Sequence, residues 1–311
     1  MAVASLGGSR FKPAAARSIT PAVRPAIGIA LALVLLVTVP AESAPEDRRL
    51  AAVSSWAFAI GDGALHPGVA ARWGAYDLVV VDGEEVTAKQ VAGLHRAGAL
   101  VLGYVSVGTI EKGRGWAASA RPYRLEHWDD WDEWFADVAQ PGFRDLMAGE
   151  VAPEMLAKGL DGLFLDNTDM VEDHPEQRLG MIELVRRLAV EHPQQLLFTQ
   201  NGESLLEPLV PHLDGWNRED VSSTYDFERE RYARVPAAEV RRVQATLRDL
   251  GSRGLLVTAT DYTAAGDGRS ARNAVRRACA AGALPYVGDI ELTRRPARPY
   301  RCARRGAAGR P

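Results

Sequence analysis

The stretch GLDGLFLDNTD spans residues Gly159 to Asp169 and joins a short apolar run to a cluster of carboxylates and an amide. A run such as Gly162 to Leu165, bounded by Gly and Asp, is typical of a parallel β-strand that is covered on both faces. Asp166, Asn167 and Asp169 follow at the carboxyl end of this strand. Ligands bind at that end of the sheet in open and closed α/β folds, so the stretch predicts a functional site as well as a strand.

The same alternation of apolar runs and helical patterns recurs along the chain. Eight strands alternating with helices over roughly 250 residues predict a single (β/α)8 TIM barrel. A doubly wound open sheet is the alternative, but the sequence after the first strand, FAIGDGAL, has no glycine-rich phosphate loop. The predicted strands are Trp56 to Ile60, Tyr76 to Val81, Leu100 to Val107, Gly162 to Leu165, Leu196 to Thr199, Gly215 to Asn217, Leu255 to Thr258 and Leu284 to Val287. The clearest predicted helices are Thr87 to Gly98, Arg178 to His192, Ala237 to Gly251 and Ala271 to Gly282.

The N-terminal residues have the layout of a secretory signal peptide. Four basic residues precede an apolar run from Ile27 to Val39, and small residues follow at Ala41 and Ser43. We therefore expect a signal peptide over residues 1–43, the barrel over 44–293 and an Arg-rich tail over 294–311, in a secreted or periplasmic protein. The apolar run is shorter than the ~20 residues of a membrane span, and an uncleaved anchor is the alternative.

The net charge of the chain narrows the choice of binding partners. Removing residues 1–43, with four basic residues and one acidic residue, moves the net charge from −3 to −6. The tail carries seven arginines and no acid, so residues 44–293 carry a net charge of −13. An acidic body argues against nucleic acid as a partner. It is compatible with a cationic partner, or with a surface whose charge only keeps the protein soluble.

The two cysteines, Cys279 and Cys302, permit one disulfide in an oxidising compartment; two free thiols are the alternative.

A long segment follows the third predicted strand, from Glu111 to about Gly142. It contains four of the seven tryptophans. Loops of this length in barrels are usually functional, and their rings can stack on the apolar faces of sugars. The alternative is that individual rings pack the segment onto the barrel rim. The four are Trp116, Trp128, Trp131 and Trp134.

Carboxylates and amides dominate the polar residues that follow the predicted strands, and a barrel brings these residues into one mouth. Such a mouth suits hydrolysis of a glycosidic bond, in which one carboxylic acid protonates the leaving oxygen and a carboxylate attacks or activates water. Binding of Mg²⁺ or Ca²⁺ is an alternative for oxygen ligands. Helix capping is an alternative for Asp62, Asp82 and Asp220.

A family resemblance rests on these motifs. The series YDLVVVDG, LGYVSVGTIE, GLDGLFLDNTD, FTQNGE, GWNREDV and YVGDIEL resembles the glycoside hydrolase family 114 barrels, of the endo-α-1,4-polygalactosaminidase type, over about Trp56 to Leu292. The resemblance implies a retaining hydrolase that cuts α-1,4-linked galactosamine-containing exopolysaccharide. It maps the catalytic pair onto Asp166, expected to be the nucleophile, and Glu219, the expected acid/base. A retaining mechanism places two such carboxyl groups about 5 to 5.5 Å apart.

We expect the other strand-end residues to bind the sugar. Four of them are candidates for pairing with ammonium groups of the polymer: Asp169, Glu203, Asp261 and Asp289. The remaining candidates are Asp82, Tyr104, Ser106, Asn167, Asn201 and Tyr262. We expect neither a cofactor nor a metal, no nucleic-acid or membrane partner for the mature protein, and a monomer. A noncatalytic carbohydrate-binding barrel of the cell envelope is the alternative function.

Overall fold

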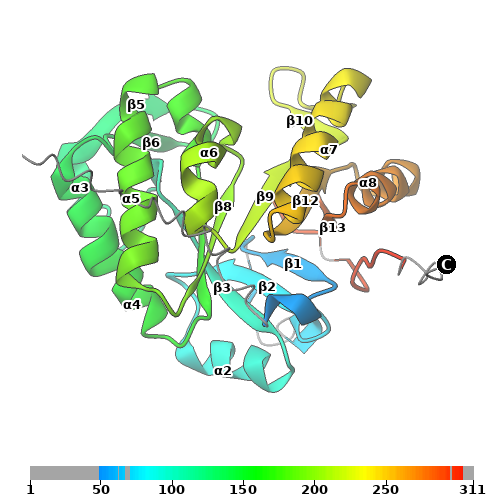
Figure 1. The fold of residues 1–311 in the computed structure, drawn as a ribbon, viewed down its shortest axis with the longest axis horizontal. Coiled ribbons are helices and arrows are strands. Elements are labelled where there is room, and N and C mark those ends of the chain that lie inside the picture. Colours follow the sequence, from blue (N-terminus) through cyan, green and yellow to red (C-terminus); the bar gives the residue numbers. More distant parts are fainter. Residues whose placement is uncertain (1–48, 62, 67–70, 295, 304–311) are drawn as a thin grey trace, which may run out of the picture. The chain divides into compact units, whose positions relative to one another are not determined.

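The computed structural model describes residues 49–61, 63–66, 71–294 and 296–303 (Figure 1). Three expectations therefore lie outside the described residues: the signal peptide over 1–43, the role of Asp62, and the structure of 304–311. Among the described helices, none has the length and apolar character needed to cross a bilayer.

Eight parallel strands form one nearly closed barrel sheet, which confirms the predicted TIM barrel. Their spatial order follows the chain, and each predicted strand has its counterpart. The first and last strands, β1 and β13, are joined through side chains, because Trp56 donates to the carbonyl of Leu284 at 2.9 Å and Tyr286 donates to that of Phe58 at 3.1 Å. The strands are β1 (Trp56–Ala59), β2 (Leu78–Asp82), β3 (Leu100–Ser106), β7 (Gly162–Asp166), β8 (Leu196–Gln200), β9 (Gly215–Glu219), β12 (Leu256–Tyr262) and β13 (Leu284–Gly288).

Aromatic side chains fill the interior of the barrel. The ring of Phe164 on β7 lies 5.0 Å from Phe58 and 6.4 Å from Trp56, both on β1. These strands are not neighbours in the sheet, so the rings meet across the barrel. All three side chains are buried. The sequences of the strands are continuously apolar because both faces of each strand are covered.

Helices surround the sheet. Thr87 caps the first of them with a capping box, which its sequence TAKQ predicts, because Thr87 and Gln90 each accept a hydrogen bond from the backbone of the other. The longer helices are α2 (Ala88–Arg96), α5 (Arg178–Glu191), α7 (Ala237–Ser252) and α8 (Gly268–Ala280). The shorter ones are α3 (Pro141–Leu146), a π-helical turn (Met147–Val151), α4 (Ala152–Leu156), α6 (Leu206–Leu209) and 3-10 turns at Leu50–Ala52, Arg121–Tyr123, Thr168–Glu172, Pro175–Gln177, Glu203–Leu205 and Val210–His212.

Two small antiparallel sheets interrupt the alternation. The segment between β3 and α3 folds into three strands in the order β4-β6-β5, namely β4 (Thr109–Ile110), β5 (Arg124–Trp128) and β6 (Glu133–Ala136). A hairpin of β10 (Ser223–Asp226) and β11 (Arg231–Arg234) follows β9. Neither sheet was predicted from the sequence, which indicated only a long segment after the third strand.

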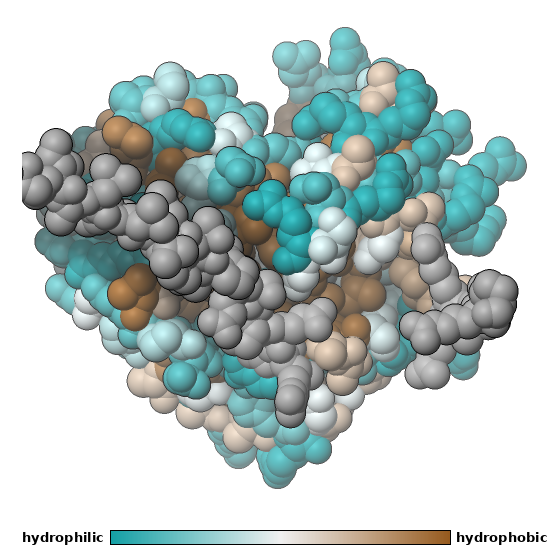
Figure 2. Space-filling model, viewed as in Figure 1, coloured by the Kyte–Doolittle hydropathy of each residue, from teal (hydrophilic) through white to brown (hydrophobic). Residues whose placement is uncertain are grey.

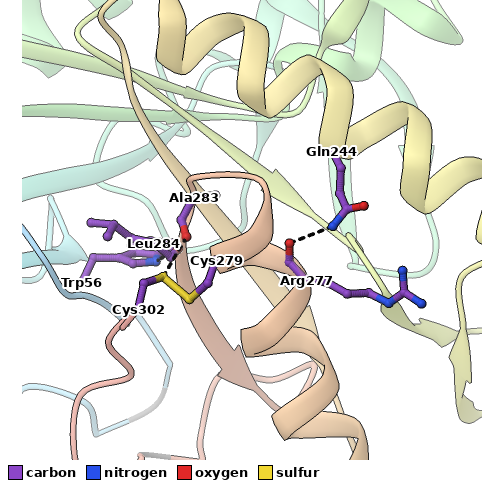
Figure 3. Close-up of a disulfide and its surroundings, with 7 residues drawn as sticks. All are labelled: Trp56, Gln244, Arg277, Cys279, Ala283, Leu284 and Cys302. Carbon is purple, nitrogen blue, oxygen red and sulfur yellow. Dashed lines mark hydrogen bonds between the residues drawn. A yellow bond between two sulfur atoms is a disulfide. The ribbon is translucent and has the colours of Figure 1, made fainter. Parts of the chain in front are cut away.

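The C-terminal segment is tied to the barrel by a disulfide. Cys279 in α8 and Cys302 are bonded, with Cα atoms 5.4 Å apart (Figure 3). Of the two alternatives that the sequence left open, the disulfide is therefore the one present.

Candidate active site

Asp166 ends β7 and is surrounded by hydrogen-bond donors. Its Oδ1 accepts from the backbone N–H of Asn167 and from Gln200 Nε2, both at 2.7 Å. Its Oδ2 accepts from the hydroxyl of Tyr104 at 2.8 Å. Burial raises the pKa of Asp166, and these three hydrogen bonds oppose that rise because they stabilise the ionised carboxylate. The arrangement orients a carboxylate that carries its negative charge among donors.

Glu219 ends β9 and has a different environment. Its Oε1 accepts from the hydroxyl of Tyr262 and its Oε2 from Asn201 Nδ2, the latter at 2.8 Å. Burial raises the pKa of Glu219 to about 8, with further contributions from the negative charges of Asp166 and Asp220. Glu219 therefore holds a proton at neutral pH, and the Asp166 carboxylate is one of the groups that keep it there.

Buried polar side chains fix the amides that contact both carboxyl groups. Gln200 Oε1 accepts from Asn217 Nδ2 at 2.7 Å, so the amino group of Gln200 faces Asp166. Asn217 Oδ1 in turn accepts from Thr258 at 2.8 Å. These hydrogen bonds form in only one orientation of each amide, so the buried side chains of the barrel interior fix the direction of the hydrogen bond from Gln200 to Asp166.

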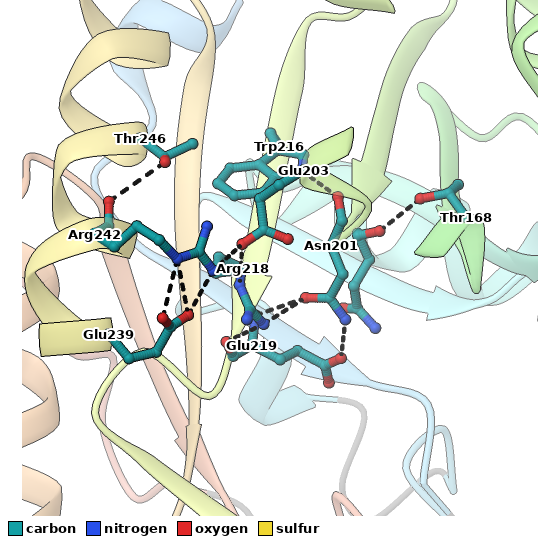
Figure 4. A network of polar contacts seen from close by, with 10 residues as sticks. Thr168, Asn201, Glu203, Trp216, Arg218, Glu219, Glu239, Arg242 and Thr246 are labelled. Atoms are coloured by element: carbon teal, nitrogen blue, oxygen red, sulfur yellow. Dashed lines mark hydrogen bonds and ion pairs between the residues drawn. The ribbon is translucent and has the colours of Figure 1, made fainter. Parts of the chain in front are cut away.

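A second relay orients Asn201 (Figure 4). Arg218 Nη1 and the backbone N–H of Glu219 both donate to Asn201 Oδ1 at 3.1 Å, which turns Asn201 Nδ2 toward the Glu219 carboxyl group. Glu203 accepts from Arg218 Nε at 2.8 Å and also lies 3.4 Å from Arg242. Glu203 thus acts on the site through Arg218, a residue that the sequence analysis did not select.

Three successive strands end in the same local geometry. In each case the last strand residue lines the cavity, and the next residue has a positive φ, at 57°, 52° or 53°. Asn and Asp tolerate this left-handed conformation better than other residues that have a Cβ atom. The pairs are Asp166–Asn167, Gln200–Asn201 and Glu219–Asp220.

The segment between β3 and α3 places further acidic side chains near Asp166. Glu133 on β6 accepts from Thr109 at 2.6 Å. Burial raises the pKa of Glu133, and the charge of Asp166 raises it further. Glu111 has its pKa raised to about 7, mainly by burial and also by Glu133, while Arg114 opposes the shift. Sequence reasoning missed Glu133, whose only signal is an acid set among aromatic residues in DEWF.

Arg114 is the one cationic side chain among the described residues that line this cavity. Its Nη1 lies 2.7 Å from Asp82 and its Nε donates to Glu111 at 2.8 Å. Asp82 also accepts from the backbone N–H groups of Glu84 and Glu85, both at 2.9 Å, and so stabilises the turn after β2. The helix-capping alternative for Asp82 is wrong, because Thr87 is the N-cap of α2.

These side chains surround a cavity of about 560 Å³ at the carboxyl ends of the strands. Ten carboxyl groups line it, and aromatic rings stand among them. Glu219 is protonated at neutral pH and Glu111 and Asp169 are partly so, because their pKa values are raised to about 8, 7 and 7, and the remaining ionised carboxylates make the cavity anionic. The carboxyl groups belong to Asp82, Glu111, Glu133, Asp166, Asp169, Glu172, Asp173, Glu219, Asp220 and Glu291, and the rings to Phe58, Tyr104, Trp128, Trp131, Phe135, Phe227 and Tyr262.

The structure places both expected catalytic residues and six of the ten other candidates in the cavity lining. These six are Asp82, Tyr104, Asn167, Asp169, Asn201 and Tyr262. Burial raises the pKa of Asp169 to about 7, assisted by the charge of Asp166. Gln200, which the sequence placed at the mouth without a role, is a direct partner of Asp166.

The remaining four candidates do not line the cavity. Ser106 is buried and accepts from Asn167 Nδ2 at 2.9 Å, and Glu203 pairs with Arg218. Asp261 is buried and accepts from the backbone N–H groups of Ser222 and Ser223 at 2.6 and 2.7 Å. Asp289 accepts from Thr293 at 2.8 Å and from the backbone of Arg294 at 3.0 Å.

Within the described residues, no group of three or more His, Cys, Asp or Glu side chains is arranged to hold a metal ion. A TIM barrel with a carboxylate-lined cavity at the carboxyl ends of its strands is an architecture of carbohydrate-cleaving enzymes. The chain belongs to glycoside-hydrolase family GH114, whose sequence profile matches residues 38–305. It is accordingly a glycoside hydrolase, as the motif resemblance implied.

The chain is also similar to individual proteins and solved structures, and the solved structures share its fold. An uncharacterised protein of Deinococcus radiodurans is 28% identical over 279 residues, which cover 82% of this chain and 87% of the relative. The glycoside hydrolase domain of PelA from Pseudomonas aeruginosa has a similar fold, with a TM-score of 0.68 at 24% identity over 78% of this chain and 97% of that domain. Ega3 from Aspergillus fumigatus, solved in complex with galactosamine, has a TM-score of 0.61 at 18% identity over 80% and 95% of the two chains.

Proposed function

We propose that the protein is a secreted, retaining hydrolase that cleaves α-1,4-linked galactosamine-containing polysaccharide, with Asp166 as nucleophile and Glu219 as acid/base. The observation that carries the proposal is the unequal environment of the two carboxyl groups. Asp166 is surrounded by three donors that favour its ionised form, whereas the pKa of Glu219 is raised to about 8, first by burial and then by the charge of Asp166. One group is thus prepared to attack and the other to donate a proton.

In the first step, Asp166 forms a bond to the anomeric carbon while the bond to the leaving sugar oxygen breaks, and Glu219 transfers its proton to that oxygen. Asp166 Oδ2 is the better placed nucleophilic atom, because it accepts one hydrogen bond and Oδ1 accepts two. In the second step, ionised Glu219 takes a proton from water, which attacks the anomeric carbon and releases Asp166.

The amino sugar is favoured by the charge of the cavity. Ten carboxyl groups face one guanidinium among the described lining residues. Two buried carboxylate oxygens, Glu111 Oε1 and Asp220 Oδ1, have no hydrogen-bond partner among the described residues. Buried polar atoms are normally paired, so these two are acceptors for ammonium or hydroxyl groups of a sugar. Ega3, whose structure contains galactosamine, supports the same substrate class.

The decisive experiment is reducing-end release from acetylated and deacetylated α-1,4-galactosamine polymers by the wild type, Asp166→Asn and Glu219→Gln. Each substitution is expected to lower kcat by roughly three orders of magnitude or more. Glu207→Gln, at an exposed acid outside the cavity, is the matched control. A product that keeps the α configuration at early times supports retention. Inversion would reassign Asp166, and absence of cleavage with retained binding would favour a noncatalytic carbohydrate-binding barrel.

The proposal extends to the place of action. An export segment over residues 1–43 takes the enzyme to the periplasm or the outside of the cell, where exopolysaccharide is found. N-terminal sequencing of the protein recovered from culture medium and periplasm tests this. A mature N-terminus after Ala41 or Ser43 is expected, and a full-length protein in the membrane fraction would favour the uncleaved anchor instead.

A further inference from the structure

A second cavity, of about 470 Å³, shares no lining residue with the catalytic one. It lies where the β10–β11 hairpin, the start of α7 and the first three turns of α8 come together. We call it the arginine cavity, because five arginines and no acid line it. Its lining consists of Ser222, Ser223, Arg234, Val235, Ala237, Val240, Arg269, Ser270, Arg272, Asn273, Arg276 and Arg277.

Three of the arginines share one face of α8. Arg269, Arg272 and Arg276 follow one another at spacings of three and four residues, which places them side by side on a helix. Figure 2 shows hydrophilic side chains gathered over α7 and α8. Figure 3 shows the side chain of Arg277 extending from α8 beside α7, where Gln244 Nε2 donates to the Arg277 carbonyl at 2.8 Å.

No acidic side chain in the lining of the arginine cavity neutralises the positive charge of its five arginines. Among the described residues, none of the five forms an ion pair with a carboxylate, although Arg114, Arg218 and Arg242 elsewhere in the barrel do. Like charges three and four residues apart destabilise a helix. A protein with a net charge of −3 that gathers five uncompensated guanidinium groups around one cavity is suited to bind an anion there.

Two carboxylates lie nearby, do not line the cavity and are already engaged. Asp261 is buried and accepts from the backbone N–H groups and the hydroxyls of Ser222 and Ser223. Asp267 is the N-cap of α8 and accepts from the backbone N–H of Ser270 at 3.0 Å. This hydrogen bond lowers the pKa of Asp267, and the charge of Arg234 contributes to a smaller degree. Asp267 does not line the cavity, so the charge of its five arginines stays in excess.

We propose that the arginine cavity binds a phosphate group, with a diphosphate or a phosphodiester as the recognised chemistry. Guanidinium groups bind phosphate oxygens in paired hydrogen bonds, and five of them, from α8 and the end of β11, line this one cavity, which suits a phosphate with oxygens on several sides. The hydroxyl of Ser270 and the amide NH2 of Asn273 supply further donors, whereas the hydroxyls of Ser222 and Ser223 already donate to Asp261. The volume exceeds the need of one phosphate and accommodates two linked ones.

Calorimetric titration with pyrophosphate at fixed ionic strength tests the proposal in the full-length protein. The wild type is expected to bind one equivalent saturably. Arg272→Gln/Arg276→Gln is expected to weaken binding by roughly 100-fold, since each charge-assisted contact accounts for about a factor of ten. The matched control, Arg241→Gln/Arg248→Gln, removes two exposed arginines of α7 that do not line the cavity and is expected to bind within about twofold of the wild type.

Further ligands distinguish charge from chemistry and one phosphate source from another. Citrate, a polycarboxylate, is expected to bind at least about tenfold more weakly than pyrophosphate. Flotation with phosphatidylglycerol vesicles, against phosphatidylcholine vesicles, shows whether the phosphate belongs to a lipid headgroup or to a soluble ligand. Equal loss of binding in both double variants, no saturation by the wild type, or equal affinity for citrate would each overturn the proposal. Unchanged circular dichroism of the variants excludes misfolding as the cause of a loss.

Discussion

At the scale of single residues, the two catalytic candidates differ through their neighbours rather than their type. Both carboxyl groups end parallel strands of one barrel, and burial raises the pKa of both. Asp166 receives three hydrogen bonds, whereas Glu219 receives two and also experiences the charge of Asp166. Burial is therefore the main reason that Glu219 holds a proton, and the negative charge of Asp166 adds to it.

The pKa of Glu219 has a consequence for stability. Its value of about 8 in the folded state exceeds the ordinary 4.5 of an unfolded chain, so between pH 4.5 and 8 the folded protein binds more protons. Stability must fall as the pH rises through that window. Glu219→Gln, which cannot ionise, is expected to flatten this part of the curve and to exceed the wild type in stability at pH 9 by a few kcal/mol.

Urea denaturation at pH 4, 6, 8 and 9 measures this difference. Glu207→Gln removes an exposed carboxylate and serves as the control, for which no such pH-dependent gain is expected. Parallel curves for the wild type and Glu219→Gln would show that the pKa of Glu219 is not raised in the folded protein.

Sequence reasoning located residues at strand ends but not the direction of their side chains. Asp261 and Tyr262 are neighbours on β12, and only Tyr262 reaches the cavity, because successive residues of a strand point to opposite faces. Thr258 and Thr260 point to the same face of β12 as Tyr262, and both donate to the buried Asn217 inside the barrel. The predicted strand ended at Thr258, so the sequence did not show which of Asp261 and Tyr262 faces the barrel interior.

At the scale of elements, two small hairpins carry aromatic rings to the rim of the catalytic cavity. Trp131, in the turn between β5 and β6, lies 5.7 Å from Phe227, in the turn between β10 and β11. Each side chain is 39% exposed, and both line the cavity. Trp116 and Trp134 pack on the core, which was the alternative role of the segment. Trp128 and Trp131 line the cavity, and their stacking on sugars stays a prediction.

Truncation of either rim ring is expected to weaken substrate binding. Trp131→Ala and Phe227→Ala should each raise KM roughly tenfold, because a sugar loses its stacking surface, and leave kcat within about twofold, because neither ring contacts the carboxyl pair. Initial rates on the deacetylated polymer measure both constants. Leu179→Ala, an exposed apolar side chain on α5, is the control. An unchanged KM in both rim variants would exclude these rings from substrate binding.

The disulfide is an element-scale constraint on the C-terminal segment. Cys279 and Cys302 are separated by 23 residues, for which loop-closure entropy gives about 3 kcal/mol of stabilisation. Cys279→Ser/Cys302→Ser is expected to lower Tm by roughly 7 °C in a barrel of this size, with kcat unchanged since neither cysteine lines the catalytic cavity. Scanning calorimetry of the oxidised wild type, the reduced wild type and the variant measures the effect. Equal melting of all three would show that the bond contributes nothing to stability.

Element boundaries explain what the sequence did and did not predict. The strands over 162–166, 196–200, 215–219 and 256–262 all run further than predicted, into polar residues. Hydrophobic patterning predicts that a strand ends where its apolar run ends. Where an active site is built on strand ends, the strand extends further, through carboxylate and amide residues. The β10–β11 hairpin was missed because its strands pair only with each other around a highly charged turn, FERER, and carry no strong apolar alternation.

At the scale of the whole molecule, charge is distributed unevenly. Ten carboxyl groups line the catalytic cavity beside one arginine, while five arginines line the arginine cavity without an acid. Net charge alone, at −3, conceals this separation. A concentrated negative potential in a cleft attracts cations and raises their rate of association, which salt then screens.

This potential predicts a salt dependence that differs between substrates. For a deacetylated galactosamine polymer, which is cationic, kcat/KM is expected to fall roughly tenfold between about 0.05 and about 0.5 M NaCl. A fully acetylated polymer is neutral and should lose less than about twofold. Glu172→Gln/Asp173→Asn removes two carboxylates of the cavity wall outside the catalytic pair and should reduce the slope for the cationic polymer alone. Equal slopes for the two polymers would mean that the acids of the cavity act through local hydrogen bonds to the sugar, and that long-range attraction contributes nothing to substrate capture.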